Sequence, residues 1–148
     1  MAMFAIKYAR ESHLRVADVG SYDVNGTFRD IFEHCSYTGL DIAEGPGVDK
    51  IITIDDFGTD QYDCVISGST MEHVEDMQQW MDNCASITKP GGLLCIIAPH
   101  GMSDFEEHFH PLDCWRIWPH GMRWLARKLE VIKCWRDIKD TVLIARKP

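Results

Sequence analysis

Three carboxylate side chains lie at or just after the ends of short apolar segments, which is where a ligand-binding chemistry is easiest to place. These residues are Asp18, Asp41 and Asp56. Ionised carboxylates accept hydrogen bonds from hydroxyl and amino groups and attract positive charge. The pattern therefore predicts a ligand that carries hydroxyl and amino groups and some positive charge.

A glycine-containing turn follows the first apolar segment, as Gly20-Ser21-Tyr22-Asp23-Val24-Asn25-Gly26. Dinucleotide binding requires G-x-G-x-x-G, because the second glycine lets the backbone approach a pyrophosphate. Tyr22 occupies that position, which argues against a nicotinamide-dependent oxidoreductase or epimerase. Asp18 and Asp23 also make the turn acidic. S-adenosyl-L-methionine carries a sulfonium and an ammonium against one carboxylate, so an acidic turn favours it over the phosphates of NAD.

Apolar periodicity predicts alternating strands and helices that would bring these residues together. We expect strands at 14–19, 37–42, 51–54, 62–67 and 93–98, two strands within 129–147, and helices at 3–11, 27–35, 75–88 and from Pro119. This order predicts an α/β Rossmann-like three-layer sandwich, mostly parallel, with one antiparallel strand near the C-terminus. Ligands of such sheets bind beyond the C-terminal ends of the strands.

Length and composition limit the partners and the compartment. The 148 residues suit one domain, covering residues 1–148, and the net charge is −8. Residues 1–115 contain 6 Lys/Arg and 20 Asp/Glu, whereas residues 116–148 contain 9 and 3. The acidic body disfavours nucleic acid, and no apolar run is long enough for a membrane span. The six cysteines show no C-x-x-C spacing, so we expect free thiols in a cytoplasmic setting.

Five segments in this order resemble class I S-adenosylmethionine-dependent methyltransferases, of the small Rossmann-like, methyltransferase type 11-like kind: VADVGSYDVNG, YTGLDI, IDDF, YDCVISGSTMEHV and KPGGLLCIIAP. The resemblance covers nearly the whole chain and implies S-adenosyl-L-methionine as the cofactor. It implies that Asp18, Gly20, Ser21, Tyr22, Asn25 and Gly26 bind the methionine part of the cofactor. Asp41 and Ile42 would contact the ribose, and Asp56 and Phe57 the adenine. Ser67, Gly68, Ser69 and His73 would lie near the amino end.

The sequence departs from that family in two ways. The usual glycine loop is G-x-G-x-G, whereas this chain has only Gly20 and Gly26 with a longer insert between them. The helices expected after the second and third strands are replaced by loops. The adenosine side of the cofactor is therefore expected to be more exposed.

The segment PLDCWRIWPHGM resembles a stretch that lies over the acceptor side in many small bacterial methyltransferases. By that resemblance Trp115 and Trp118 would form apolar walls, and Arg116 would anchor an anionic acceptor. The candidates for a general base are His100, His108 and His110. The alternatives are that the tryptophans pack in the core and that Arg116 pairs with Asp113.

We therefore expect methyl transfer to the hydroxyl, amine or carboxylate of a small-molecule acceptor, with the oligomeric state left open. One alternative is a non-catalytic binding module that keeps the fold. Another is a metal-assisted O-methyltransferase, because Glu72-His73 with His108 and His110 resembles part of an E-x-x-E-H…H metal set. Ser69 replaces the first glutamate of that set, which weakens a site for a hard cation, so no metal is expected.

Overall fold

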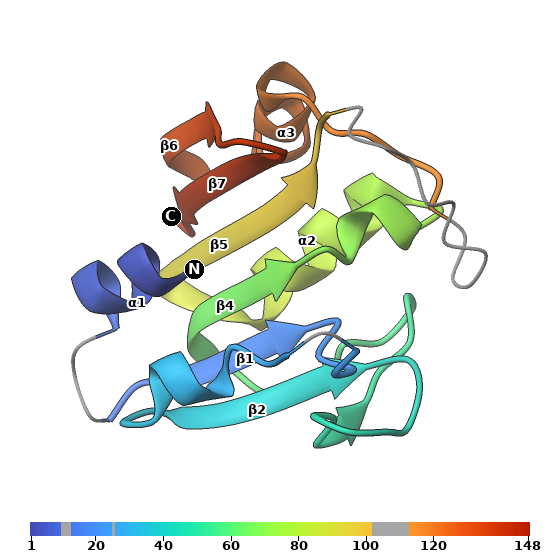
Figure 1. Cartoon of the computed structure of the whole chain (residues 1–148). Helices are drawn as coiled ribbons and strands as arrows, with labels where there is room; N and C mark the ends of the chain where they lie inside the picture. Colours follow the sequence, from blue (N-terminus) through green and yellow to red (C-terminus); the bar gives the residue numbers. More distant parts are fainter. Residues whose placement is uncertain (10–12, 25, 102–112) are drawn as a thin grey trace.

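The computed structural model describes residues 1–9, 13–24, 26–101 and 113–148. Within them a seven-stranded sheet has the order β3-β2-β1-β4-β5-β7-β6 (Figure 1). The strands are β1 (Arg15–Val19), β2 (Ser36–Asp41), β3 (Lys50–Ile51), β4 (Tyr62–Gly68), β5 (Thr88–Pro99), β6 (Glu130–Arg136) and β7 (Asp140–Arg146). Three α-helices, α1 (Ala2–Tyr8), α2 (Met77–Ile87) and α3 (Pro119–Leu125), and two 3-10 helices, η1 (Arg29–Phe32) and η2 (Met71–His73), accompany the sheet.

The sheet confirms the predicted mostly parallel architecture with one antiparallel strand. β7 runs antiparallel to both β5 and β6, and the pairs from β3 to β5 are parallel. From β1 the chain builds outward through β2 to β3, and from β4 it builds the other way to β5. The order thus reverses between β1 and β4, and the crevice for a ligand lies beyond the C-terminal ends of these two strands.

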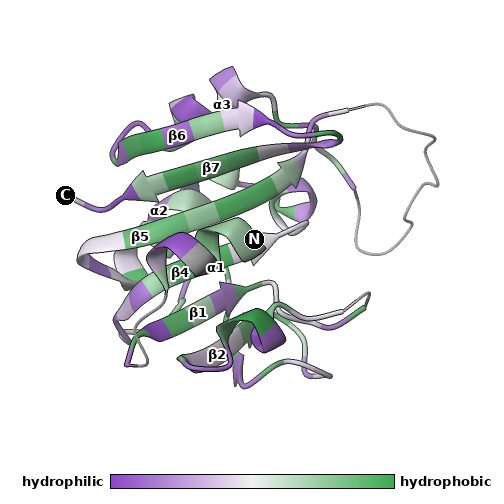
Figure 2. Cartoon of the chain, turned by 60° about the vertical axis from the view of Figure 1, so that its left-hand side comes forward, coloured by the Kyte–Doolittle hydropathy of each residue, from purple (hydrophilic) through white to green (hydrophobic). Residues whose placement is uncertain are grey.

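Hydrophobic cores lie on both faces of the sheet, because successive strand residues point to opposite sides. Ala17 and Val65 pack with α2 and α3, whereas Val16 and Ile66 pack with α1 and η1. Figure 2 shows the central strands as largely hydrophobic, which is expected for strands covered on both faces. Among the described residues no helix is long and apolar enough to cross a membrane.

Helix α2 confirms the clearest sequence prediction. Its N-cap, Asp76, accepts a hydrogen bond of 2.9 Å from the backbone N–H of Gln79. The buried side chains are Trp80, Met81, Cys84 and Ile87, which recur at helical spacing. The helix ends where the Thr88 hydroxyl donates to the carbonyl of Cys84 at 2.7 Å and β5 begins.

Three predicted elements differ from the structure. The helix expected at 27–35 is only the single 3-10 turn η1, where the N–H groups of Ile31 and Cys35 donate to carbonyls three residues earlier rather than four. The strand expected at 51–54 is the two-residue β3, since Thr53 and Asp56 exchange backbone hydrogen bonds across a turn. β5 begins five residues before the predicted start at Leu93, and its register against β4 shifts where the Pro90-Gly91-Gly92 stretch is passed.

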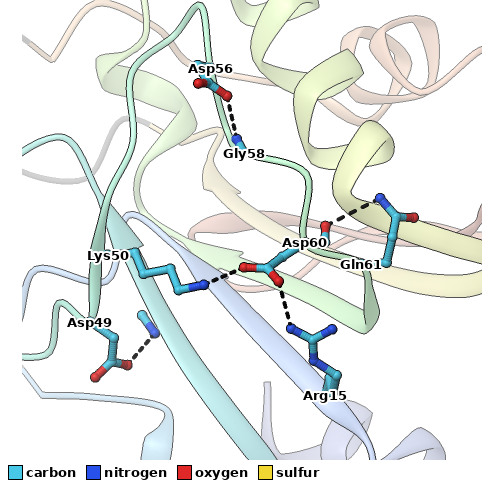
Figure 3. A network of polar contacts seen from close by, with 8 residues as sticks. Arg15, Asp49, Lys50, Asp56, Gly58, Asp60 and Gln61 are labelled. Carbon is cyan, nitrogen blue, oxygen red and sulfur yellow. Dashed lines mark hydrogen bonds and ion pairs between the residues drawn. The ribbon is translucent and has the colours of Figure 1, made fainter.

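Polar contacts hold the short connections that replace helices on both sides of β3. Asp60 accepts hydrogen bonds from Lys50 and, at 3.1 Å, from Arg15, which joins β3 and β1 to the following loop (Figure 3). Asp49 accepts from the backbone N–H of Gly39 at 2.7 Å and from Arg29 at 2.6 Å. These contacts fix the β2–β3 edge without a covering helix.

Candidate cofactor and acceptor site

The end of β1 is joined to the end of β4 through one carbonyl group. The hydroxyl of Ser67 donates to the Val19 carbonyl at 2.6 Å, and the hydroxyl of Thr70 lies 3.3 Å from the same oxygen. The next backbone N–H, that of Gly20, donates to the carbonyl of Leu40 in β2 at 2.8 Å. The loops after β1, β2 and β4 are therefore held together at the switch point.

Gly20 is required at its position for two reasons. Its φ of +82° lies in the left-handed region, and a Cβ atom there would lie 2.0 Å from Oγ1 of Thr70. Gly26 also has a positive φ, +112°, but an added Cβ would meet no heavy atom of the described residues within 4 Å. Its N–H donates to Asp23 at 2.7 Å. The predicted ligand Asn25 lies outside the described residues.

Asp41 joins the glycine loop to the end of β2. One oxygen accepts from the N–H of Tyr22 at 3.0 Å, and the other accepts from the N–H of Ala43 at 3.1 Å. Each carboxylate oxygen keeps a further lone pair with which it can accept a ribose hydroxyl. Next to this contact, the hydroxyl of Ser21 is buried and has no hydrogen-bond partner among the described residues.

Asp18 lies beneath the glycine loop and is only 5% exposed. The hydroxyl of Tyr37 donates a hydrogen bond to its carboxylate. Burial raises the pKa of Asp18 to about 6, and the Tyr37 hydrogen bond and the charge of Arg29 oppose that rise. The negative charge of this acid therefore depends on pH near neutrality.

The predicted adenine and ribose neighbours lie in different environments. Ile42 is 74% exposed beside Asp41, and Asp56 is exposed, with its carboxylate accepting from the N–H of Gly58 at 2.7 Å. Phe57 is 7% exposed and packs in the core on the α2 side. The surface on the adenosine side is thus formed by Ile42 and polar turn atoms, while most of the Phe57 ring is used in packing.

The chain turns sharply at Gly68 and Ser69, where β4 ends. Gly68 lies against the ring of Phe28, and an added Cβ would be 2.8 Å from it. Ser69 is exposed and has a φ of +53°, which is uncommon for a residue with a side chain. His73 is half-buried, with its Nε2 3.9 Å from Oε1 of Glu72.

The described acceptor-side residues are engaged in contacts within the protein. Arg116 donates to both carboxylate oxygens of Asp113. The structure thus shows the pairing with Asp113 that the sequence left as an alternative. Trp115 donates to the carbonyl of Val74 at 2.9 Å. The ring of His100, 3% exposed, lies 5.3 Å from that of Trp118.

His100 also uses its Nε2 atom in a 3.0 Å contact with the carbonyl of Asp137. The other predicted bases, His108 and His110, lie outside the described residues. The described part of the chain contains no group of three or more His, Cys, Asp or Glu side chains arranged to hold a metal ion. The buried cysteines Cys64, Cys84, Cys95 and Cys134 are free thiols.

Two residues of this region are absent from the predicted cofactor and catalytic residues, although Glu72 was named in the metal alternative. Thr70 contacts Gly20 directly, and Glu72 is 4% exposed. A Thr within a polar loop carries no sequence signal for contact with a glycine fifty residues earlier. Glutamate is also among the residue types least often buried, so burial of Glu72 is not predictable from its type.

Comparison with known proteins was consistent with this geometry. Residues 3–134 match the family described as "Methyltransferase domain". No curated protein sequence matches the chain. Among solved structures, the fold is similar to phosphoethanolamine N-methyltransferase 2 from Haemonchus contortus, with a TM-score of 0.78 at 14% identity, covering 99% of this chain and 51% of that chain.

Two further structures share the fold. The 1,6-didemethyltoxoflavin-N1-methyltransferase of Burkholderia thailandensis has a TM-score of 0.74 at 14% identity, covering 99% of this chain and 75% of that one. The CurJ carbon methyltransferase has a TM-score of 0.69 at 12% identity, covering 96% of this chain and 50% of that one. The chain thus spans about half the length of two of these three proteins. With the family matched over most of its length, the chain belongs to the methyltransferase-domain family and is a class I S-adenosylmethionine-dependent methyltransferase.

Proposed function

We propose that this methyltransferase transfers the methyl group of S-adenosylmethionine to a hydroxyl, amine or carboxylate of a small-molecule acceptor. The observation that carries the proposal is the convergence of three loops on the Val19–Gly20 peptide. This convergence holds the glycine loop, Asp41 and the Ser67–Thr70 turn at one edge of the sheet, where a single ligand can contact all of them.

The residues present fit the cofactor. Asp41 has lone pairs left for ribose hydroxyls. Among the described residues, the buried Ser21 hydroxyl has no partner and none lies within 4 Å of a Cβ added at Gly26. When bound, S-adenosylmethionine supplies an electrophilic methyl group on a positively charged sulfur. The protein then acts by orienting the acceptor in line with that methyl group and by excluding water.

Calorimetric titration with S-adenosylmethionine and S-adenosylhomocysteine tests the cofactor part of the proposal. Wild type is expected to bind both ligands, and Asp41→Ala is expected to bind each at least about tenfold more weakly, through loss of about 1.4 kcal/mol. The exposed Asp30 provides a matched control, and Asp30→Ala should bind as wild type does. Absence of binding to folded wild type at millimolar ligand would contradict the proposal.

A second candidate is a binding module without turnover, which the lengthened glycine loop favours. It predicts a folded protein that forms no S-adenosylhomocysteine with any acceptor. Mass spectrometry of S-adenosylhomocysteine in reactions with small acceptors separates the two candidates.

A further inference from the structure

Glu72 lies next to the point where the strand order reverses. It belongs to η2, in the loop that follows β4, and it is two residues from Thr70, which contacts Gly20. The loops after β1 and β4 border the crevice in which a sheet of this order binds its ligand. Glu72 is therefore in the loop that contacts the glycine loop, two residues from the point of contact.

The carboxyl group of Glu72 is buried without full hydrogen bonding. The residue is 4% exposed, and Oε2 has no hydrogen-bond partner among the described residues. Oε1 lies 3.9 Å from Nε2 of His73, beyond hydrogen-bond distance. A buried carboxylate oxygen with no partner among the described residues is costly, and it can accept a hydrogen bond from a bound group.

The backbone, rather than the carboxyl group, holds Glu72 in place. Its carbonyl accepts from the N–H groups of Cys114 and Trp115 at 2.9 and 3.2 Å. The indole N–H of Trp115 donates to the carbonyl of Val74 at 2.9 Å, which secures the same junction. The loop after β4 is thus fixed against residues 113–116 by contacts that would survive a change of the Glu72 side chain.

The charges around the Glu72 carboxyl group affect which kind of ligand group can bind beside it. Burial raises the pKa of Glu72 and the charge of Asp113 acts in the same direction, while a hydrogen bond from its own backbone and the charges of His73 and Arg116 oppose the rise. Arg116 forms a two-point pair with Asp113. A second anion placed beside Glu72 and Asp113 would be repelled, whereas an N–H or O–H group would satisfy the orphaned oxygen.

We propose that Oε2 of Glu72 receives the hydrogen of an N–H or O–H group on the methyl acceptor, so that the acceptor is an amine or an alcohol rather than a carboxylate. This inference rests on the proposed methyltransferase function. The acceptor nitrogen or oxygen gains the methyl group as the methyl–sulfur bond breaks, and the sulfur keeps the bonding electron pair. The proton lost by the acceptor passes to the Glu72 carboxylate.

Transfer of labelled methyl groups from S-adenosylmethionine tests this assignment. The acceptors form a panel in which each carbon skeleton is offered as the amine, the alcohol and the carboxylic acid. Wild type should methylate amine or alcohol members only. Glu72→Gln should lower kcat/KM by about 100-fold or more, the usual scale of general-base catalysis, and Glu72→Asp should retain part of it. Glu75→Gln, at an exposed glutamate three residues away, should act as wild type does.

Two further measurements separate this role from a structural one. Glu72→Gln should keep the wild-type affinity for S-adenosylhomocysteine, and its urea midpoint should not fall below that of wild type, because the orphaned charge is removed. A lower midpoint would assign Glu72 to a stabilising ion pair and overturn the inference. So would methylation of the carboxylic acids, unchanged kcat/KM in Glu72→Gln, or cofactor binding without transfer to any panel member. Absence of cofactor binding by folded wild type would instead overturn the proposed function itself.

Discussion

The hydroxyl of Ser67 donates a 2.6 Å hydrogen bond to the carbonyl of Val19, which joins the end of β4 to the residue that precedes the glycine loop. Both groups lie in the buried interior of the sheet edge. The bond spans 48 residues of sequence and sets the direction in which the glycine loop leaves β1.

Removing this hydroxyl should weaken both stability and cofactor binding. Ser67→Ala is expected to lower the free energy of unfolding by about 1–2 kcal/mol, because the Val19 carbonyl loses its 2.6 Å side-chain partner and keeps the longer contact with Thr70. The affinity for S-adenosylhomocysteine should fall with it, as measured by calorimetry. Ser86→Ala is the control, since the Ser86 hydroxyl donates to the Asn83 carbonyl on an exposed part of α2. Equal ligand affinity in Ser67→Ala and wild type would contradict a role for this bond in positioning the loop.

The contact between Gly20 and Thr70 can be separated from backbone strain by comparing two glycines. Gly20→Ala should destabilise the protein more than Gly91→Ala. Both glycines have a positive φ, but of the two only Gly20 has a neighbour within 4 Å in the described part of the chain. The shared backbone strain costs about 1–3 kcal/mol in urea unfolding, and the steric clash at Gly20 adds to it. Thr70→Ala should recover part of the loss in a double variant. Equal destabilisation by Gly20→Ala and Gly91→Ala would show that the contact with Thr70 has no energetic effect.

The buried acid Asp18 should make stability depend on pH. Because the pKa of Asp18 is about 6 in the folded protein, above its ordinary value of 3.8, the folded state binds this proton more tightly than the unfolded chain. The contribution of Asp18 to stability is therefore present below pH about 4 and is lost as the pH rises through 6.

Asp18→Asn stays neutral at every pH and keeps an oxygen that can accept from Tyr37. It should exceed wild type in free energy of unfolding by up to about 3 kcal/mol at pH 8, with the difference vanishing below pH about 4. Urea unfolding at both pH values measures this, with Asp30→Asn as the exposed control. A pH-independent difference between Asp18→Asn and wild type would contradict burial as the cause.

Local patterns predicted the parts of the fold that depend on local sequence. The period of Trp80, Met81, Cys84 and Ile87 identified α2, and the continuous apolar run from Leu93 identified the centre of β5. The length of β5 was less predictable, since its start at Thr88 depends on pairing with Tyr62 of β4. The turn η1 was predicted as a longer helix because Phe28, Ile31, Phe32 and Cys35 recur at helical spacing, and that spacing does not distinguish an α-helix from 3-10 turns.

The candidate site also has a part that the sequence predicts and a part that depends on packing. The predicted loops at the C-terminal ends of the strands are brought together at one edge, because parallel strands end on the same side of the sheet. The internal partners of these residues were not predictable, because the contacts of Asp18 with Tyr37 and of Gly20 with Thr70 depend on packing between distant segments. The core position of Phe57 likewise depends on α2, which packs on the same face and donates from Gln79 and Asn83 to the Ile54 carbonyl of this loop.

A crystal structure with S-adenosylhomocysteine bound tests the central claim most directly. The ligand is predicted to lie beyond β1 and β4, with its ribose hydroxyls within hydrogen-bond distance of Asp41 and its sulfur between the loops at 20–26 and 68–73. A ligand bound at another edge of the sheet, or a ribose with no contact to Asp41, would contradict the account.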